Sequence, residues 1–170
     1  MPKIIENVRG KLLEETQKQL AERGYAATTV RSVASACGLG VGTVYNYFPS
    51  KDMMIANFML EDWQSCLAEM REGDEEEILF RVHNALKKYI ERHQTLFRDK
   101  DALKAFTAVF MERHKQLRGS IANVLLPVCE TSSVADKRFL AEFLAESLLT
   151  WTVAGKSFEE ISSIIMKLIK

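Results

Sequence analysis

Hydrophobic side chains recur along this 170-residue chain at the three- and four-residue intervals of an α-helix, and strand-like alternation is almost absent. A first helix is expected from about Lys3 to Arg23, because Gly24 follows it as an end signal. A capping box at Ser157 and Glu160 opens the last helix. The helices expected between these two cover residues 28–37, 41–47, 50–70, 74–90, 99–116, 118–129 and 133–154. The pattern predicts an all-α protein of about nine helices.

Two short helices between residues 28 and 48 are separated by a glycine turn. Thr28 is expected to cap the first of them, and Gly38 supplies the left-handed residue that ends it. The second has about seven residues, too few to be stable alone. Four of them carry hydrogen-bonding groups, which suits a surface better than a core: Thr43, Tyr45, Asn46 and Tyr47. This layout is typical of a helix-turn-helix, whose second helix enters the DNA major groove.

A set of short segments in the same region keeps fixed spacings: Gly24-Tyr25, Thr28-Thr29-Val30, Val33-Ala34, Gly38, Gly42-Thr43-Val44-Tyr45, Tyr47-Phe48 and Ser50-Lys51-Asp52. With these segments the chain resembles, from about Arg9 to Ile55, the DNA-binding domain of the tetracycline-repressor (TetR) family of bacterial regulators. The resemblance implies an N-terminal three-helix DNA-binding domain over residues 1–50 and a C-terminal helical bundle over 51–170 for ligand sensing and dimerisation. One departure is Gly40, where the family usually has a serine that caps the recognition helix and often touches a phosphate.

The distribution of charge along the chain gives modest support for DNA binding by the N-terminal region. Lys and Arg equal Asp and Glu in number, so the net charge of zero does not indicate a nucleic-acid partner. Residues 1–51 carry a net charge of +3 and the remainder −3, which suits a protein that meets DNA at one end. Three widely spaced cysteines form neither a disulfide framework nor a zinc motif. With no signal peptide and no apolar run approaching membrane-spanning length, we expect a bacterial cytoplasmic protein without a membrane span.

The candidate DNA contacts lie on and around the second short helix. Gly42 allows close approach of the backbone, Asn46 is suited to adenine, and Lys51 suits a phosphate. Val41 is either a base contact or an ordinary surface valine, and Arg31 is a secondary candidate. Phe48 is expected to anchor the helix in the core. The complete predicted set is Thr28, Thr29, Val41, Gly42, Thr43, Tyr45, Asn46, Tyr47 and Lys51; the family resemblance implies that the positions of Tyr45 and Tyr47 meet the DNA backbone.

Catalysis and cofactor binding find no support in the sequence. The glycines between 38 and 42 follow a helix and not a strand, which argues against a dinucleotide loop. His83, His93 and His114 lie on different predicted helices, and the last two come near helix ends, where solvent exposure is the ordinary outcome. No metal site and no nucleophile–base arrangement is visible. We therefore expect no cofactor, no metal and no enzymatic activity.

Aromatic and aliphatic residues in the remaining helices suggest two further surfaces. A ligand pocket for a small hydrophobic or aromatic effector would be lined by Trp63, Tyr89, Phe106 and Phe110, although such residues can equally form ordinary core. The last two helices carry apolar stripes wide enough for two contacts, and the resemblance implies the same helices for dimerisation. The residues chosen for a homodimer interface are Phe139, Phe143, Leu144, Trp151, Ile161 and Ile165.

Three functions are compared. The first is a ligand-responsive transcriptional regulator, more often a repressor in this family, that binds a palindromic double-stranded DNA operator as a homodimer. The second is a DNA-binding dimer without a small-molecule sensor, either constitutive or controlled by a protein partner. The third is an all-helical enzyme that carries a helix-turn-helix, for which no convergent set of titratable groups is found. The sequence favours the first.

Overall fold

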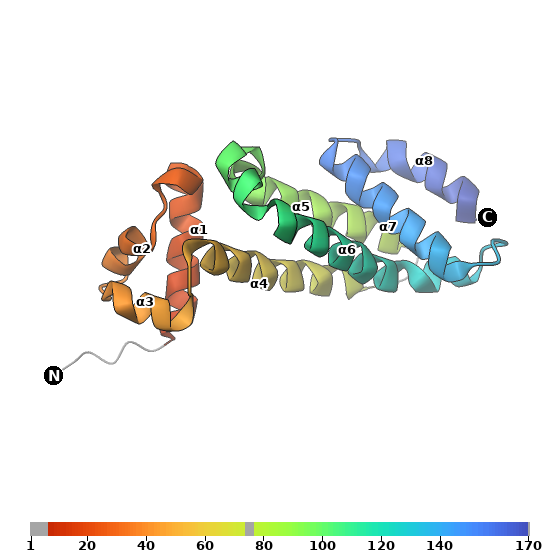
Figure 1. Ribbon diagram of the computed structural model, residues 1–170. Helices are drawn as coiled ribbons and strands as arrows, with labels where there is room; N and C mark the ends of the chain where they lie inside the picture. Colours follow the sequence, from red (N-terminus) through yellow and green to blue (C-terminus); the bar gives the residue numbers. More distant parts are fainter. Residues whose placement is uncertain (1–6, 74–76, 170) are drawn as a thin grey trace. The chain divides into compact units, whose positions relative to one another are not determined.

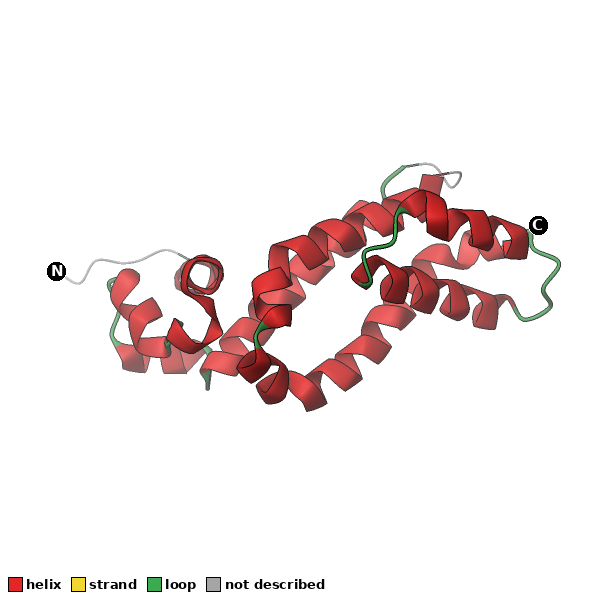
Figure 2. Cartoon of the chain, turned by 90° about the horizontal axis from the view of Figure 1, so that it is seen from above, coloured by secondary structure: helices red, strands yellow, loops and turns green. Residues whose placement is uncertain are grey.

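The computed structural model describes residues 7–73 and 77–169, except for the side chains of residues 106–114. Figure 2 shows helices and connecting loops and no strand in this part of the chain, which confirms the all-α prediction. The helices are Val8–Ala27 (α1), Val30–Ala36 (α2), Val41–Tyr47 (α3), Lys51–Arg71 (α4), Ile78–Arg98 (α5), Lys100–Glu130 (α6), Lys137–Val153 (α7) and Phe158–Ile169 (α8).

Helix α1 loses its regular geometry at Gly24, where the sequence predicted its end. Gly24 has a φ of 76°, a backbone conformation that glycine adopts without steric cost. Thr28 then closes the helix, because its backbone N–H and its hydroxyl both donate to the Gly24 carbonyl oxygen, at 3.3 and 2.8 Å. At the other end the Asn7 side chain accepts from the Gly10 N–H, and the expected start at Lys3 lies outside the described residues.

Helix α2 is capped by Thr29 and not by Thr28, which corrects the sequence prediction. The Thr29 hydroxyl accepts from the Ser32 N–H and the Ser32 hydroxyl oxygen accepts from the Thr29 N–H, each at 3.0 Å. The other end follows the prediction, because Gly38 has a φ of 68° and the Leu39 N–H reaches back to the Ala34 carbonyl. The Gly38 N–H also donates to the Ser35 carbonyl oxygen. Together the two hydrogen bonds form a Schellman motif, which sets the turn before α3.

Helices α1, α2 and α3 lie together (Figure 1) and share one core. Its members are fully or almost fully buried and come from α1, α2, α3 and the residue after α3: Leu12, Leu13, Leu20, Val33, Ala34, Val44 and Phe48. Phe48 is 1% exposed, which confirms its predicted role as the anchor of α3. The guanidinium of Arg9 lies 5.7 Å from the centroid of the Phe48 ring and also bonds to Asn57 of α4. This pairing ties α1 to the start of α4.

The chain divides into two compact units. The first contains the described residues of 1–62 and 93–107, and the second contains 63–92 and 108–170 with the same exclusions. Helices α4, α5 and α6 each contribute to both. The unit that holds the helix-turn-helix therefore extends beyond the expected domain of residues 1–50 and includes parts of α5 and α6.

His93 lies in the interior of the first unit, contrary to the expectation of exposure. Its side chain is 2% exposed, and Nε2 lies 2.7 Å from Oδ2 of Asp62. The rings of Phe58 and Phe97 lie 5.0 and 6.1 Å from the imidazole, centroid to centroid. A buried imidazole of this kind needs a hydrogen-bond partner, which Asp62 on α4 supplies. His114 lies outside the described side chains.

The expected break between residues 116 and 118 does not occur, because α6 continues through both segments. Gly119 stands inside the helix at a cost of about 1 kcal/mol relative to alanine, and neighbouring buried residues offset that cost by packing. These are Ile121, Ala122, Val124 and Leu125. This packing is consistent with one continuous helix over the two expected segments.

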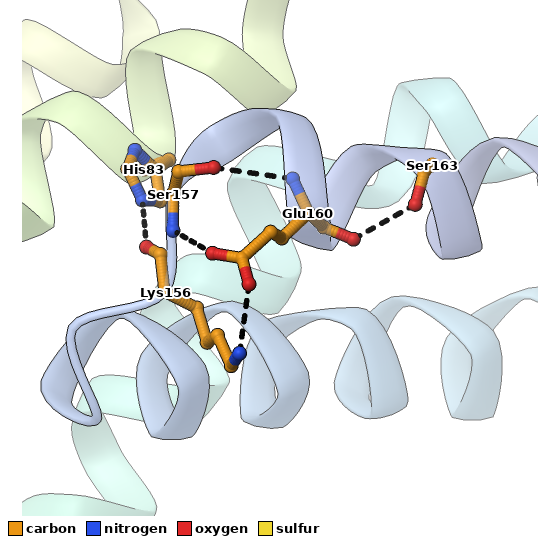
Figure 3. Close-up of polar contacts among 5 residues, drawn as sticks. All are labelled: His83, Lys156, Ser157, Glu160 and Ser163. Atoms are coloured by element: carbon orange, nitrogen blue, oxygen red, sulfur yellow. Dashed lines mark hydrogen bonds and ion pairs between the residues drawn. The ribbon is translucent and has the colours of Figure 1, made fainter.

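Helix α7 begins at Lys137, later than the predicted Ser133, because Asp136 is its cap and accepts from the Phe139 N–H at 2.9 Å. The capping box predicted for α8 is present (Figure 3): the Ser157 N–H donates to Glu160, and the Glu160 N–H donates to the Ser157 hydroxyl. His83 of α5 lies 3.1 Å from the Lys156 carbonyl oxygen and so ties α5 to this turn. None of the described helices is both long and apolar enough to span a membrane.

Candidate nucleic-acid interface

Helix α3 divides sharply between a buried side and an exposed side. Val44 is fully buried, whereas Tyr45 and Tyr47 are 51% and 46% exposed and Asn46 is also exposed. Large aromatic side chains that lie open to solvent lose the stabilisation of burial, so their exposure indicates a surface that meets another molecule. The predicted contacts Tyr45, Asn46 and Tyr47 therefore stand together on the outer side of the helix.

The first turn of α3 presents mostly backbone. Gly42 is exposed, and a methyl group added to it would meet no protein atom within 4 Å. Val41 and Thr43 beside it are half-buried. Gly40 caps the helix without a side-chain hydrogen bond. Nothing in the fold of this unit therefore requires glycine at position 42.

The two threonines before α2 have different environments. Thr28 is fully buried and its hydroxyl is bonded to Gly24, so the predicted DNA contact at Thr28 is wrong. Thr29 is exposed, with its hydroxyl at the start of α2. Ser32, its partner in the capping box, also donates to the buried Gln19 side chain of α1 at 2.6 Å. These bonds fix the start of α2 relative to α1.

A hollow of about 490 Å³ opens where the starts of α2, α3 and α4 come together. It is lined by Thr29, Val30, Arg31, Val41, Tyr45, Pro49, Ser50 and Lys51. Four of the predicted DNA contacts thus line one surface depression, and both charged residues in its lining are basic. We call this depression the basic hollow. The basic and hydroxyl-bearing side chains of its lining are of the kinds that contact phosphate oxygens of DNA.

Lys51 occupies the edge of the basic hollow but is not an ordinary solvated lysine. Its Nζ donates to the Tyr25 carbonyl oxygen at 2.9 Å and lies 3.6 Å from the centroid of the Tyr25 ring. Burial lowers the pKa of Lys51, while Asp52 and Asp99 act in the opposite direction. Tyr25 in turn donates from its hydroxyl to Asp52 at 2.7 Å. Burial and this hydrogen bond raise the pKa of Tyr25 to about 12.

The sequence indicated no role for Tyr25 or Pro49, and it predicted Ser50 as the cap of the helix over residues 50–70. Ser50 caps α4, since its hydroxyl accepts from the Met53 N–H at 3.1 Å. Tyr25 is 26 residues away from Lys51, so no spacing rule connects the two. The only signal that could have selected it was its place among the fixed segments that carry the family resemblance.

The predicted effector pocket is only partly described. Trp63 and Tyr89 are 4% and 7% exposed, and their rings meet edge to face with centroids 5.2 Å apart. Phe106 and Phe110 lie outside the described side chains. Trp63 and Tyr89 thus serve as packing between α4 and α5. In the part of the chain that the structure describes, no group of three or more His, Cys, Asp and Glu residues could hold a metal ion.

The predicted dimer residues divide into two groups. Phe139, Phe143 and Trp151 are 63%, 48% and 50% exposed along α7. Leu144, Ile161 and Ile165 are instead buried in the protomer's own core, so they cannot supply a free surface, and this part of the prediction is corrected. The exposed apolar residues of α8 are Ile164, Met166 and Leu168. Helices α7 and α8 lie side by side and run in opposite directions (Figure 1), and each exposes several large apolar side chains.

Comparisons with known proteins agree with this arrangement of helices. Residues 12–57 match the profile described as "Bacterial regulatory proteins, tetR family". The repressor KstR2 of Mycobacterium tuberculosis is 42% identical over 57 residues, 32% of this chain and 28% of that protein. The regulator UidR of Escherichia coli is 28% identical over 64 residues, 38% of this chain and 33% of that protein. The chain therefore matches about a third or less of the length of these curated relatives.

Solved structures extend the similarity to the whole fold. The fatty acid degradation regulator FadR from Bacillus halodurans is 20% identical, with a TM-score of 0.61 over 98% of this chain and 96% of that chain. A putative TetR-family regulator from Rhodococcus sp. gives a TM-score of 0.67 at 17% identity, over 95% of each chain. Residues 12–57 of this chain thus match the DNA-binding domain of the TetR family. In TetR-family terms, α2 and α3 are its helix-turn-helix, and the matched residues include every residue of the basic hollow.

Proposed function

We propose that this chain is a TetR-family transcriptional repressor that binds a palindromic DNA operator as a homodimer in the bacterial cytoplasm. The observation that carries the proposal is the outer side of α3, where exposed Tyr45, Asn46 and Tyr47 adjoin the basic hollow within the family-matched residues. Polar aromatic side chains next to basic residues suit a phosphate-rich partner. The curated relatives named above as a repressor and a regulator support the same function.

The contacts divide by the chemistry of each side chain. Thr29, Tyr45 and Lys51 line the basic hollow, so we assign them to the DNA backbone, together with Thr43 and Tyr47 beside it. Val41 and Asn46 project from the helix that would enter the major groove, and we assign them to base edges. An asparagine amide matches the donor and acceptor pair of adenine. Gly42 lets the strand approach the α3 backbone.

Dimerisation would use the exposed apolar residues of α7 and α8. Phe139, Phe143 and Trp151 carry most of the exposed ring surface, and Ile164 and Leu168 extend it onto α8. An apolar patch of this kind on a monomer favours aggregation, whereas two copies about a two-fold axis would bury it in a four-helix contact. Two recognition helices held about 34–36 Å apart would then enter successive major grooves.

The proposal also includes a site in the second unit that binds a small effector. Relatives named for ketosteroid and fatty acid degradation regulation support a small hydrophobic or aromatic effector. The edge-to-face packing of Trp63 on Tyr89 favours the second candidate instead, a DNA-binding dimer without a sensor, because those two rings fill their own space. An effector site would then have to open by separating them.

Selection of duplexes from a random-sequence pool by the purified chain tests the proposal. We expect recovery of an inverted repeat, bound in gel shifts with one dimer per site and with an affinity that falls steeply as salt increases. Light scattering on the free protein should give the dimer mass. Recovery of no enriched duplex, or of one without inverted symmetry, would contradict the proposal. A panel of steroids, fatty acids and aromatic acids that leaves the gel shift unchanged would favour the dimer without a sensor.

A further inference from the structure

Lys51, the first residue of α4, is fixed at its charged end by two contacts with one residue. Its Nζ donates to the Tyr25 carbonyl oxygen at 2.9 Å, and the same atom lies 3.6 Å from the centroid of the Tyr25 ring. A cation over the face of an aromatic ring is attracted by the negative charge density of that face. The position of the ammonium is therefore set by Tyr25 and not by solvent.

Tyr25 is itself held in place. Its hydroxyl donates to Oδ1 of Asp52 at 2.7 Å, and Asp52 directly follows Lys51 in α4. The Tyr25 ring thus contacts the Lys51 ammonium, and the Tyr25 hydroxyl contacts the Asp52 carboxylate. We call these three residues the Tyr25 clamp. Its backbone side is fixed as well, because Gly24 and Thr28 make the turn from which Tyr25 projects.

The Tyr25 clamp adjoins the candidate DNA surface. Lys51 lines the basic hollow together with Arg31, Thr29 and Tyr45. A lysine ammonium has three N–H donors, and the bond to the Tyr25 carbonyl uses one of them. The others can donate to an acceptor that enters the basic hollow. Charge-assisted bonds of this kind to phosphate oxygens are among the strong ones in proteins.

We infer that Tyr25 is a positioning residue of the DNA interface, whose ring and carbonyl hold the Lys51 ammonium at the basic hollow so that it meets a phosphate of the DNA backbone. The inference rests on the proposed function. A free lysine side chain loses rotamer freedom when it is fixed on a partner. Because the Tyr25 clamp already fixes the lysine side chain in the folded protein, less side-chain entropy is lost when DNA binds.

The alternative role of the same cluster is to keep Lys51 away from DNA, and the two roles differ in the bound state. If Tyr25 positions the lysine, the ring contact persists when DNA is bound. If Tyr25 withholds the lysine, the contact breaks. Protons above an aromatic ring resonate upfield, so the Hε protons of Lys51 report the contact directly.

The decisive measurement is therefore NMR of the labelled wild-type chain, with the Lys51 signal assigned by Lys51→Arg. We expect its Hε protons upfield of the other lysines in the free protein, and still upfield in the complex with the duplex selected from the random pool. A return to the ordinary lysine position on binding this duplex would overturn the inference. So would an ordinary position in the free protein.

The salt dependence of binding to the same duplex gives an independent test. Lys51→Met should lower the slope of log affinity against log salt by about 0.9, the value of one phosphate contact. Tyr25→Leu removes the ring but keeps the backbone carbonyl and the charge of Lys51, so it should lower the slope by only part of this value. The double variant should lower the slope no further than Lys51→Met alone, because both changes act on the same phosphate contact. Tyr25→Phe keeps the ring and the carbonyl and should keep the slope. Lys87→Met, at an exposed position on α5 outside both proposed contact surfaces, is the charge-matched control.

The experiments distinguish a failure of the Tyr25 inference from a failure of the proposed function. If the wild type binds its selected duplex and a folded Tyr25→Leu variant keeps the full slope, the inference is wrong and the proposed function stands. If the wild type selects no duplex, both are wrong. If Tyr25→Leu does not fold, as judged by thermal unfolding, the NMR measurement on the wild type decides the question alone.

Discussion

Helices α3 and α7 each expose more than one aromatic side chain, and they do so with different chemistry. On α3 the exposed rings are tyrosines, and the neighbouring basic hollow carries Arg31 and Lys51. On α7 they are Phe139, Phe143 and Trp151, and α8 adds aliphatic residues. Exposure alone marks both as contact surfaces, whereas the polar atoms decide the partner. Hydroxyls and cations fit phosphates, and hydrocarbon fits a second hydrocarbon surface.

The largest effect is expected from charges placed on the α7 surface. Phe143→Glu combined with Trp151→Glu should give monomers, because each exposed ring would be replaced by a carboxylate that cannot be buried unpaired. Loss of the second DNA contact should reduce operator affinity by about 10²–10⁴-fold. Sedimentation and gel shifts on the same samples measure both quantities.

Gln64→Glu, an added charge at an exposed position of α4, is the control and should leave a dimer. A double variant that stays dimeric would show that the interface lies elsewhere. If it is monomeric but binds the operator with full affinity, the two surfaces are not coupled through dimerisation, and the comparison between them loses its functional meaning.

Asn46→Ala separates base recognition from backbone binding on α3. The change should cost about 1–3 kcal/mol on the best duplex and relax the preference at one base pair of each half-site. Selection from the random pool with the variant measures the change in preference. Uniform weakening across all sequences would instead place Asn46 with the backbone contacts.

Gly42→Ala tests whether DNA approaches the backbone of α3. In the free protein the added methyl meets nothing within 4 Å, and alanine in place of a helical glycine stabilises by about 0.5–1 kcal/mol. In the complex the same methyl would push against the DNA, at a cost of about 1–3 kcal/mol if the contact is close-packed. We therefore expect a higher melting temperature together with weaker DNA binding.

Gly119→Ala is the matched control, since Gly119 also lies inside a helix with open space around the added methyl. It should raise the melting temperature and leave DNA affinity unchanged. Gly42→Ala binding as tightly as the wild type would remove the close approach from the proposal.

Local signals predicted the parts of the fold that local chemistry determines. Gly24 interrupts the regular geometry of α1 and Gly38 follows the end of α2, both at the expected positions, because glycine adopts their positive φ without steric cost. Adjacent Thr28 and Thr29 could each cap a helix, and only the packed structure assigns Thr28 to the end of α1 and Thr29 to the start of α2. Periodicity identified a wide apolar stripe on α7 and α8, but which of its sides faces the core was decided by tertiary packing.

The residues of the candidate site also differ in whether local sequence patterns could predict them. The outer residues of α3 follow from a short helix with too many polar groups for a core, and the sequence predicted them. The Tyr25 clamp depends on residues distant in sequence, so no local pattern could predict it. Lys51 was selected for its charge and place, yet the contacts that fix its ammonium became visible only in the folded chain.

The smallest effect is expected at Gly40, where this chain departs from the serine usual in the family. Gly40 caps α3 with no side-chain hydrogen bond, and an added Cβ would lie 3.8 Å from the Thr43 hydroxyl oxygen, an ordinary contact distance. Gly40→Ser can therefore be accommodated, and its hydroxyl can accept from the Thr43 N–H. Stability should rise by a few tenths of a kcal/mol. If the hydroxyl also reaches a phosphate, operator affinity should rise at every salt concentration with the salt slope unchanged, because a neutral donor releases no counterion.

Gly40→Ala adds the same Cβ without the oxygen and separates the two effects. Alanine is a poor cap, so this variant should be less stable than the wild type and show no gain in affinity. Thermal unfolding and anisotropy titrations with the selected duplex at several salt concentrations measure both variants. A serine variant with improved stability and an unchanged affinity would mean that this chain binds its operator without a phosphate contact at the cap of α3. In that case its contact with the DNA backbone would depend more heavily on Tyr45 and on the lysine that Tyr25 positions.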